Sequence, residues 1–183
     1  MRPATLVAVS GPPGAGKTTL AHVLADALDW PAVCRDEIKE RLAAGADSAD
    51  DLDLKTLETF FGTLGELLEA GSSLVAEAAF QDRLWRPGLE PLAGLASIRV
   101  VRCVVDPELA RERITRRAAE VPSRAVHADA DLLHRIAEGQ QPIESWVPIA
   151  LDVPYLAVNT TQGWNPSLGQ IVEFATLNPQ PRR

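Results

Sequence analysis

The strongest constraint on the fold is a glycine-rich segment near the start of the chain, SGPPGAGKTT at 10–19. It follows the apolar run TLVAV at 5–9, which predicts a buried strand. It leads into KTTLAHVLADAL at 17–28, which has the apolar spacing of a helix. Residues 11–18 match G-x-x-x-x-G-K-[ST] in the strand-to-helix context that this pattern requires. The segment therefore predicts a phosphate-binding loop.

The residue types of this segment suit a nucleoside triphosphate. Glycines let the backbone turn its N–H groups toward an anion, and the helix N-terminus adds partial positive charge. The lysine can reach the β- and γ-phosphates, and the threonine hydroxyl can bind Mg²⁺. We therefore predict ATP and Mg²⁺ as cofactors, with Lys17 also catalytic and Thr18 a metal ligand. The predicted nucleotide-binding residues are Gly11, Pro12, Pro13, Gly14, Ala15, Gly16, Lys17, Thr18 and Thr19.

The remainder of the chain alternates short apolar runs with longer helical patterns. Further strands are expected at 31–34, 72–80, 97–106 and 155–160, and helices at 36–44, 53–70, 87–96, 107–120, 129–139 and 165–177. Asp36 is expected to cap its helix, and 46–53 is expected to be a loop. The alternation predicts one α/β domain over 1–183, with a parallel sheet covered by helices on both faces. Ligands of such sheets bind at the carboxyl ends of the strands.

Composition narrows the class of partner. The net charge of −7 argues against binding to nucleic acid or an anionic membrane, although nucleic acid stays open. No apolar stretch approaches the roughly 20 residues of a membrane span. The two cysteines, Cys34 and Cys103, lack metal-type spacing and indicate a reduced, cytoplasmic protein. Only three of the eighteen basic residues are lysines, and the other fifteen are arginines. The guanidinium group of arginine has a forked arrangement of hydrogen-bond donors that suits phosphate.

With these motifs the chain resembles the P-loop kinases, and more narrowly the kinase-like ATPases grouped with polynucleotide kinase, zeta toxin and chloramphenicol phosphotransferase. The resemblance rests on SGPPGAGKTTLA, VCRDEIKERL, LVAEAAFQDR, VVDPELARERITRR and VNTTQG. It implies the three-layer P-loop NTPase sandwich, with a five-stranded parallel sheet in the order 2-3-1-4-5. It also implies an arginine-rich lid at about 111–128.

The resemblance assigns roles to residues outside the loop. Asp36 matches the catalytic base that deprotonates the acceptor, and Glu77 stands nearest to the acidic residue of the metal site. A strong Walker B aspartate is not evident, although Asp106 also follows an apolar strand. The lid arginines Arg113 and Arg117 are expected to be catalytic, and Arg117 and Thr160 to bind the nucleotide. The expected substrate-binding residues are Asp36, Arg83 and Arg124.

The function expected from this reading is Mg²⁺-dependent transfer of the γ-phosphate of ATP to a hydroxyl group of a small molecule. An aspartate one strand away from the loop favours transfer, and the guanine-binding pattern N-K-x-D does not occur in the sequence. Three alternatives remain: a polynucleotide 5′-hydroxyl kinase, a nucleotide-binding ATPase or sensor that transfers nothing, and a toxin that phosphorylates a nucleotide sugar and would have an antitoxin partner.

Overall fold

The computed structural model describes residues 3–120 and 146–177. Its centre is a parallel sheet of five strands: β1 (Ala4–Ser10), β2 (Ala32–Cys34), β3 (Leu74–Glu77), β4 (Ala96–Val104) and β5 (Tyr155–Asn159). The spatial order is β2-β3-β1-β4-β5, and every neighbouring pair is parallel. The predicted α/β fold and strand order are therefore confirmed.

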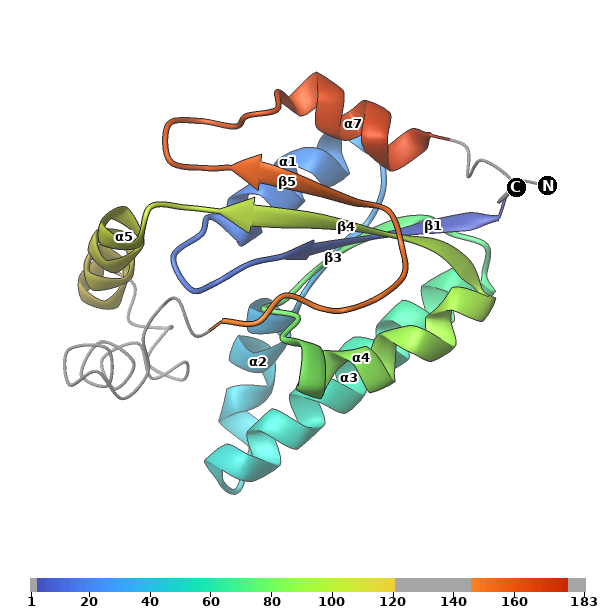
Figure 1. The fold of residues 1–183 in the computed structure, drawn as a ribbon. Coiled ribbons are helices and arrows are strands. Elements are labelled where there is room, and N and C mark those ends of the chain that lie inside the picture. Colours follow the sequence, from blue (N-terminus) through green and yellow to red (C-terminus); the bar gives the residue numbers. More distant parts are fainter. Residues whose placement is uncertain (1–2, 121–145, 178–183) are drawn as a thin grey trace.

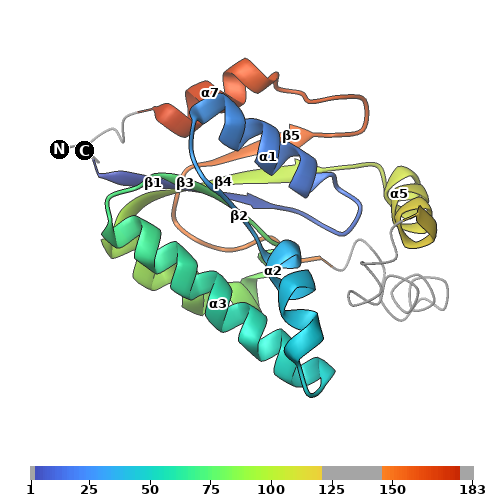
Figure 2. The same cartoon turned by 180° about the vertical axis from the view of Figure 1, so that it is seen from behind.

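Helices cover both faces of the sheet, which gives three layers (Figures 1 and 2). One face carries α1 (Lys17–Leu28) and α7 (Leu168–Thr176). The other carries α2 (Arg35–Leu42), α3 (Ala49–Glu69) and α4 (Asp82–Leu89). α5 (Pro107–Glu120) lies beyond the carboxyl end of β4, and short 3-10 turns occupy Ala43–Gly45 and Glu90–Gly94.

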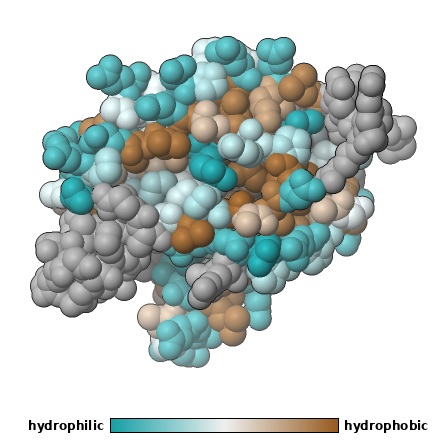
Figure 3. Space-filling view, in the orientation of Figure 1, coloured by the Kyte–Doolittle hydropathy of each residue, from teal (hydrophilic) through white to brown (hydrophobic). Residues whose placement is uncertain are grey.

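The core is divided between the two faces because successive strand residues point in opposite directions. In β1, Leu6 belongs to the cluster under α3 and α4, whereas Val7 belongs to the cluster under α1 and α7. α3 contributes a buried stripe that includes Phe60, Leu64 and Leu68, and each such side chain is worth roughly 1.5–3 kcal/mol on burial. On the face seen in Figure 3, hydrophobic residues form separate groups among hydrophilic ones.

The starts of α3 and α2 differ from the sequence expectation, and α7 begins at Leu168 instead of residue 165. α3 begins at Ala49, inside the expected loop, because the Ser48 hydroxyl accepts a hydrogen bond from the Asp51 N–H at 3.1 Å. Acidic residues in its first turn also favour the helix dipole. α2 begins at Arg35 with Cys34 at the N-cap, so Asp36 lies in the first turn and the expected cap is wrong.

The connection after β3 also differs. β3 ends at Glu77 rather than at residue 80, and Phe80 adopts a left-handed φ of 45°. The next helix is α4, which begins at Asp82 and includes Pro87, the residue expected to start it. The expected helix at 129–139 lies outside the described residues. Among the helices that the structure describes, none combines the length and apolar character needed to cross a membrane.

Candidate functional site

The phosphate loop lies at the carboxyl end of β1 and leads directly into α1. Three glycines, Gly11, Gly14 and Gly16, have φ values of 151°, 76° and 75°, a region that L side chains rarely adopt. The Ala15 N–H donates to the Pro12 carbonyl at 3.3 Å and tightens the turn. Gly16, at the N-cap of α1, has no side chain to cap the helix, so the N–H groups of the first turn are oriented for an anion.

Two of these glycines are also required by close packing. A Cβ atom on Gly14 would lie 2.5 Å from the carbonyl oxygen of Ala110 in α5. A Cβ on Gly11 would lie 2.8 Å from the carbonyl oxygen of Cys103 in β4. The backbone of the loop is therefore packed against β4 and α5, and any side chain at these two positions would force it away.

Arg113 holds the loop from the α5 side. Its guanidinium donates to the Gly14 carbonyl at 3.3 Å and to the Thr160 carbonyl at 2.8 Å. The buried Thr160 hydroxyl in turn donates to the Ala15 carbonyl at 2.8 Å. Together these bonds join the loop, α5 and the segment after β5. Arg113 therefore orients the loop, and Arg117 follows it one turn later on α5 in a half-buried position.

Lys17 and Thr18 are the polar side chains at the start of α1. The Lys17 ammonium group donates to the Pro12 carbonyl at 3.0 Å, so it folds back over the loop. The Thr18 hydroxyl donates to a carboxylate oxygen of Glu77 at 3.1 Å. Glu77 is 3 % exposed at the end of β3. A hydroxyl and a carboxylate are hard oxygen ligands of the kind that Mg²⁺ prefers, so this pair is chemically suited to the expected metal.

Asp106, the other acidic residue at a strand end, has a different environment. Its carboxylate accepts hydrogen bonds from the N–H groups of Glu108 at 2.9 Å and Leu109 at 3.2 Å. These bonds satisfy the first turn of α5, as an N-cap residue does. Its carboxylate thus supports a helix, which leaves Glu77 as the acidic residue next to Thr18.

Asp36 follows β2, at the same edge of the sheet as the loop. Its carboxylate pairs with Arg35 at 3.2 Å, and Arg35 reaches Asp53 of α3 at 2.9 Å. Lys39 also pairs with Asp53, at 2.7 Å. Burial raises the pKa of Asp53, but the hydrogen bonds and charges of Lys39 and Arg35 outweigh it and hold this pKa below its usual value. The residue expected as the base therefore belongs to a charge network between α2 and α3.

The positions of the side chains of Arg83 and Arg124, the two arginines expected to bind substrate, are not described by the structure. Arg83 lies in α4, but its side chain is not among those described. Arg124 falls outside the described residues, and so does the expected lid beyond residue 120.

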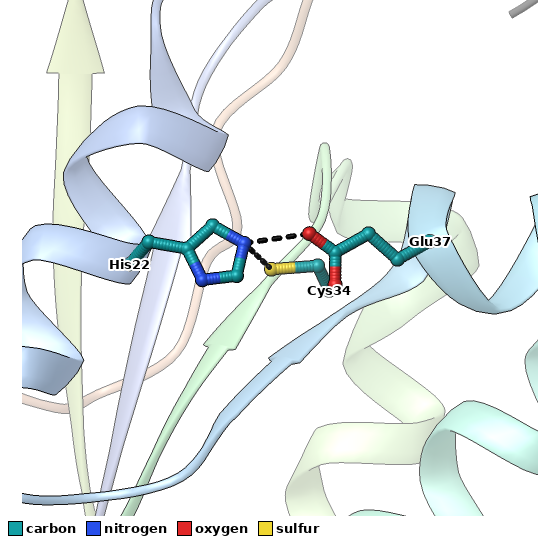
Figure 4. Close-up of side chains that lie close together, drawn as sticks. All are labelled: His22, Cys34 and Glu37. Carbon is teal, nitrogen blue, oxygen red and sulfur yellow. Dashed lines mark hydrogen bonds and ion pairs between the residues drawn. The ribbon is translucent and has the colours of Figure 1, made fainter.

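A second polar cluster was missed by sequence reasoning. The Nε2 atom of His22 on α1 points toward both the thiol of Cys34 at the end of β2 and the carboxylate of Glu37 on α2 (Figure 4). His22, Cys34 and Glu37 do not have the sequence spacing of a known metal motif. The only signal in the sequence for this cluster is that His22 lies one helical turn after Thr18.

Comparison with known families and structures agrees with this geometry. A family model described as an AAA domain matches residues 6–139. No curated protein matches the chain. A crystal structure from Chloroflexus aurantiacus, of a protein assigned as a kinase, has a TM-score of 0.78 and 27 % identity, covering 98 % of this chain and all of that one.

Two structures of lower identity show the same fold. APS kinase from Mycobacterium tuberculosis, in complex with AMPPNP and APS, has a TM-score of 0.63 and 15 % identity, covering 94 % of this chain and 98 % of that one. A sugar kinase from a Janibacter species has a TM-score of 0.61 and 20 % identity, covering 94 % of this chain and 92 % of that one. The chain thus has the fold of P-loop kinases.

Proposed function

Because the chain belongs to the AAA-domain family and has the P-loop kinase fold, we propose that it transfers the γ-phosphate of ATP to a hydroxyl group of a small molecule. The observation that carries this proposal is that four chemical groups follow the carboxyl ends of the neighbouring strands β2, β3, β1 and β4. They are the phosphate loop with Lys17, the Thr18–Glu77 pair, the Arg113 fork and Asp36, and they come from different elements.

The loop and Lys17 would hold the triphosphate. The ammonium group is already next to the Pro12 carbonyl, and a phosphate oxygen would compete for the same donor with full negative charge. Thr18 and Glu77 are the residues that would hold Mg²⁺, which when bound draws charge from the phosphate oxygens. The Glu77 carboxylate also fixes the direction of the Thr18 hydroxyl.

Asp36 would act on the acceptor. Its carboxylate would take the proton of the acceptor hydroxyl as the oxygen–phosphorus bond forms, and an ordinary carboxylate is sufficient for this late proton transfer. Arg35 pairs with Asp36 and restricts the orientation of the carboxylate. The network to Asp53 would hold both residues in place while substrates bind.

The two lid arginines would divide their roles. Arg113 already bonds to two main-chain carbonyls, so it would hold the loop that binds the phosphates. Arg117, one helical turn further, is the better candidate to neutralise charge on the transferring group. We also propose that the protein works in the cytoplasm, since both cysteines are free thiols.

A screen of acceptors with γ-labelled ATP tests the proposal. Nucleosides, sugars, aminoglycosides and oligonucleotides would be offered to the wild type and to Asp36→Asn, with the exposed Asp26→Asn of α1 as the matched control. We expect label on a small molecule, and a loss of about 100-fold or more in its transfer by Asp36→Asn with unchanged ATP affinity. Lys17→Ala should lose ATP binding itself.

Three other results would change the proposed function or the role of Asp36. Full transfer by Asp36→Asn would exclude it as the base. Label on oligonucleotides alone would make the protein a polynucleotide kinase. ATP hydrolysis without any labelled acceptor would favour the non-transferring ATPase or sensor.

A further inference from the structure

The cluster of His22, Cys34 and Glu37 brings together three metal-binding side chains from α1, β2 and α2 (Figure 4). The imidazole Nε2 lies 2.6 Å from a Glu37 carboxylate oxygen and 3.7 Å from the Cys34 sulfur. All three ligand atoms lie within 4.8 Å of one another. They therefore face a common point although 15 residues separate His22 from Glu37 along the chain.

Two of the three ligand–ligand distances are near those of a tetrahedral metal site, and the third is within 4.8 Å. With metal–ligand distances of 2.0–2.3 Å, tetrahedral ligands stand about 3.3–3.5 Å apart. The nitrogen–sulfur distance is already near this value, and the nitrogen–oxygen hydrogen bond would have to open by less than about 1 Å. Rotation of the Glu37 side chain, which is 48 % exposed, can supply that change.

The electrostatic surroundings favour a cation. The carboxylates of Glu77, Glu37 and Asp36 are close enough to the Cys34 sulfur to act on it electrostatically. The same three carboxylates attract a positive ion to this point. On α2, Arg35 and Lys39 are paired with aspartates, and Arg41 lines the same groove as Cys34 and Glu37.

The cluster is open to solvent on one side. The side chains of His22 and Glu37 are about half exposed, whereas Cys34 is buried beneath them. Cys34 and Glu37 also line a surface groove beside α2. An ion can therefore enter from the surface, and water can occupy a fourth position.

We propose that His22, Cys34 and Glu37 bind a zinc ion, with water as the fourth ligand. A thiolate, an imidazole and one carboxylate form a donor set that suits zinc rather than Mg²⁺, which prefers oxygen alone. On binding, the Cys34 thiol releases its proton to solvent, and the thiolate and Glu37 together balance the charge of the ion. Neutral His22 coordinates through Nε2.

The ion would connect two elements of the phosphate site. α1 starts at Lys17, and α2 carries Asp36 in its first turn. A metal that joins His22 to Cys34 and Glu37 would fix these two helices relative to each other across β2. This binding site stands whether or not the chain transfers phosphate.

Cobalt titration tests the site directly. Untagged protein, treated with a chelator and free of nucleotide, would be titrated with Co²⁺, whose bond to a thiolate gives a charge-transfer absorption. We expect one ion per chain, displacement by Zn²⁺ and no displacement by excess Mg²⁺. The absorption should vanish in Cys34→Ser and persist in Cys103→Ala, which removes the other buried thiol.

Variants at the exposed ligands keep the test valid if Cys34→Ser fails to fold. Loss of a residue that only hydrogen-bonds to a metal ligand weakens metal binding by roughly 10- to 100-fold. His22→Gln and Glu37→Gln each remove a ligand itself, so each should weaken Co²⁺ binding by more than that. The proposal is overturned if the wild type shows no thiolate absorption, which would leave an ordinary His–Glu pair beside a buried thiol. It is also overturned if both Gln variants bind Co²⁺ as tightly as the wild type.

Discussion

On the β4–α5–β5 side of the phosphate loop the contacts involve main-chain atoms, whereas on the β2–α2 side they join charged side chains. Gly14 packs against the Ala110 carbonyl, and Arg113 donates to two carbonyls. On the other side, Arg35 and Lys39 converge on Asp53. Main-chain packing tolerates few residue types, while charge pairs with one solvent-screened partner, such as the half-exposed Asp53, tolerate more. The first side should therefore be more sensitive to substitution.

The largest expected effect is that of Gly14→Ala. An alanine in this left-handed conformation costs about 1–2 kcal/mol of backbone strain, and the overlap of its Cβ with the Ala110 carbonyl costs about 1–3 kcal/mol. The free energy of unfolding should therefore fall by about 2–5 kcal/mol. Gly163→Ala is the control, because Gly163 has a similar φ of 82° but open space around it. Urea denaturation measures both. Equal losses would show that strain alone acts and that the packing on α5 is unimportant.

Removal of the Arg113 fork should have the next largest effect. Arg113→Ala should cost about 1.5–3 kcal/mol of stability, as expected for bonds from a charged donor, and weaken ATP binding about tenfold. Arg117→Ala should instead lower kcat more than ATP affinity. The exposed Arg116→Ala is the control and should stay within about 0.5 kcal/mol. A drop in kcat alone for Arg113→Ala would assign it to the transferring phosphate.

The charge network on the opposite side should be weaker. Asp53→Asn should cost about 1 kcal/mol, because the carboxylate is half exposed and solvent screens its pairs with Arg35 and Lys39. The exposed Glu58→Gln of the same helix should cost less than about 0.5 kcal/mol. A loss as large as that of Gly14→Ala would remove the contrast between the two sides.

The same network predicts a dependence on pH. Because the pKa of Asp53 is lowered in the folded protein, its stabilising effect is complete above the ordinary value near 3.8 and is lost as the pH falls through the lower folded value. The difference in stability between the wild type and Asp53→Asn should therefore shrink only in strong acid. Urea melts between neutral pH and acid would measure it, and a constant difference would contradict the assignment.

The last prediction concerns reactivity rather than stability, at the two buried thiols on opposite sides of the loop. Burial is the main cause that raises the pKa of Cys103, to about 12, and it raises the pKa of Cys34 as well. At pH 8 the thiolate fraction of Cys103 should be roughly a thousandfold below that of an unfolded chain. Alkylation followed by mass spectrometry should find both cysteines unreactive until denaturant is added. Rapid labelling of either thiol in the native protein would contradict this environment.

Much of the fold was readable from the sequence because its strongest signals are local. The glycine positions 11, 14 and 16 reflect backbone angles that other residues rarely adopt, and they located the loop correctly. The apolar alternation identified the parallel sheet, and the pattern at 107–120 predicted α5, which begins at Pro107 and is described as far as Glu120. The start of α3 was misread because the cap at Ser48 is hidden in an acidic stretch that looks like a loop.

What the sequence by itself determined is therefore the phosphate loop, the α/β class and, through family resemblance, the strand order. The resemblance also implied that Thr18 and Glu77 share a site. Only the tertiary structure decided the other meetings of side chains: Arg113 with a carbonyl 99 residues away, and His22 with Cys34 and Glu37. The physical reason is that backbone angles and capping are encoded by adjacent residues. Side-chain neighbours depend on strand register and helix packing, which no short segment of sequence specifies.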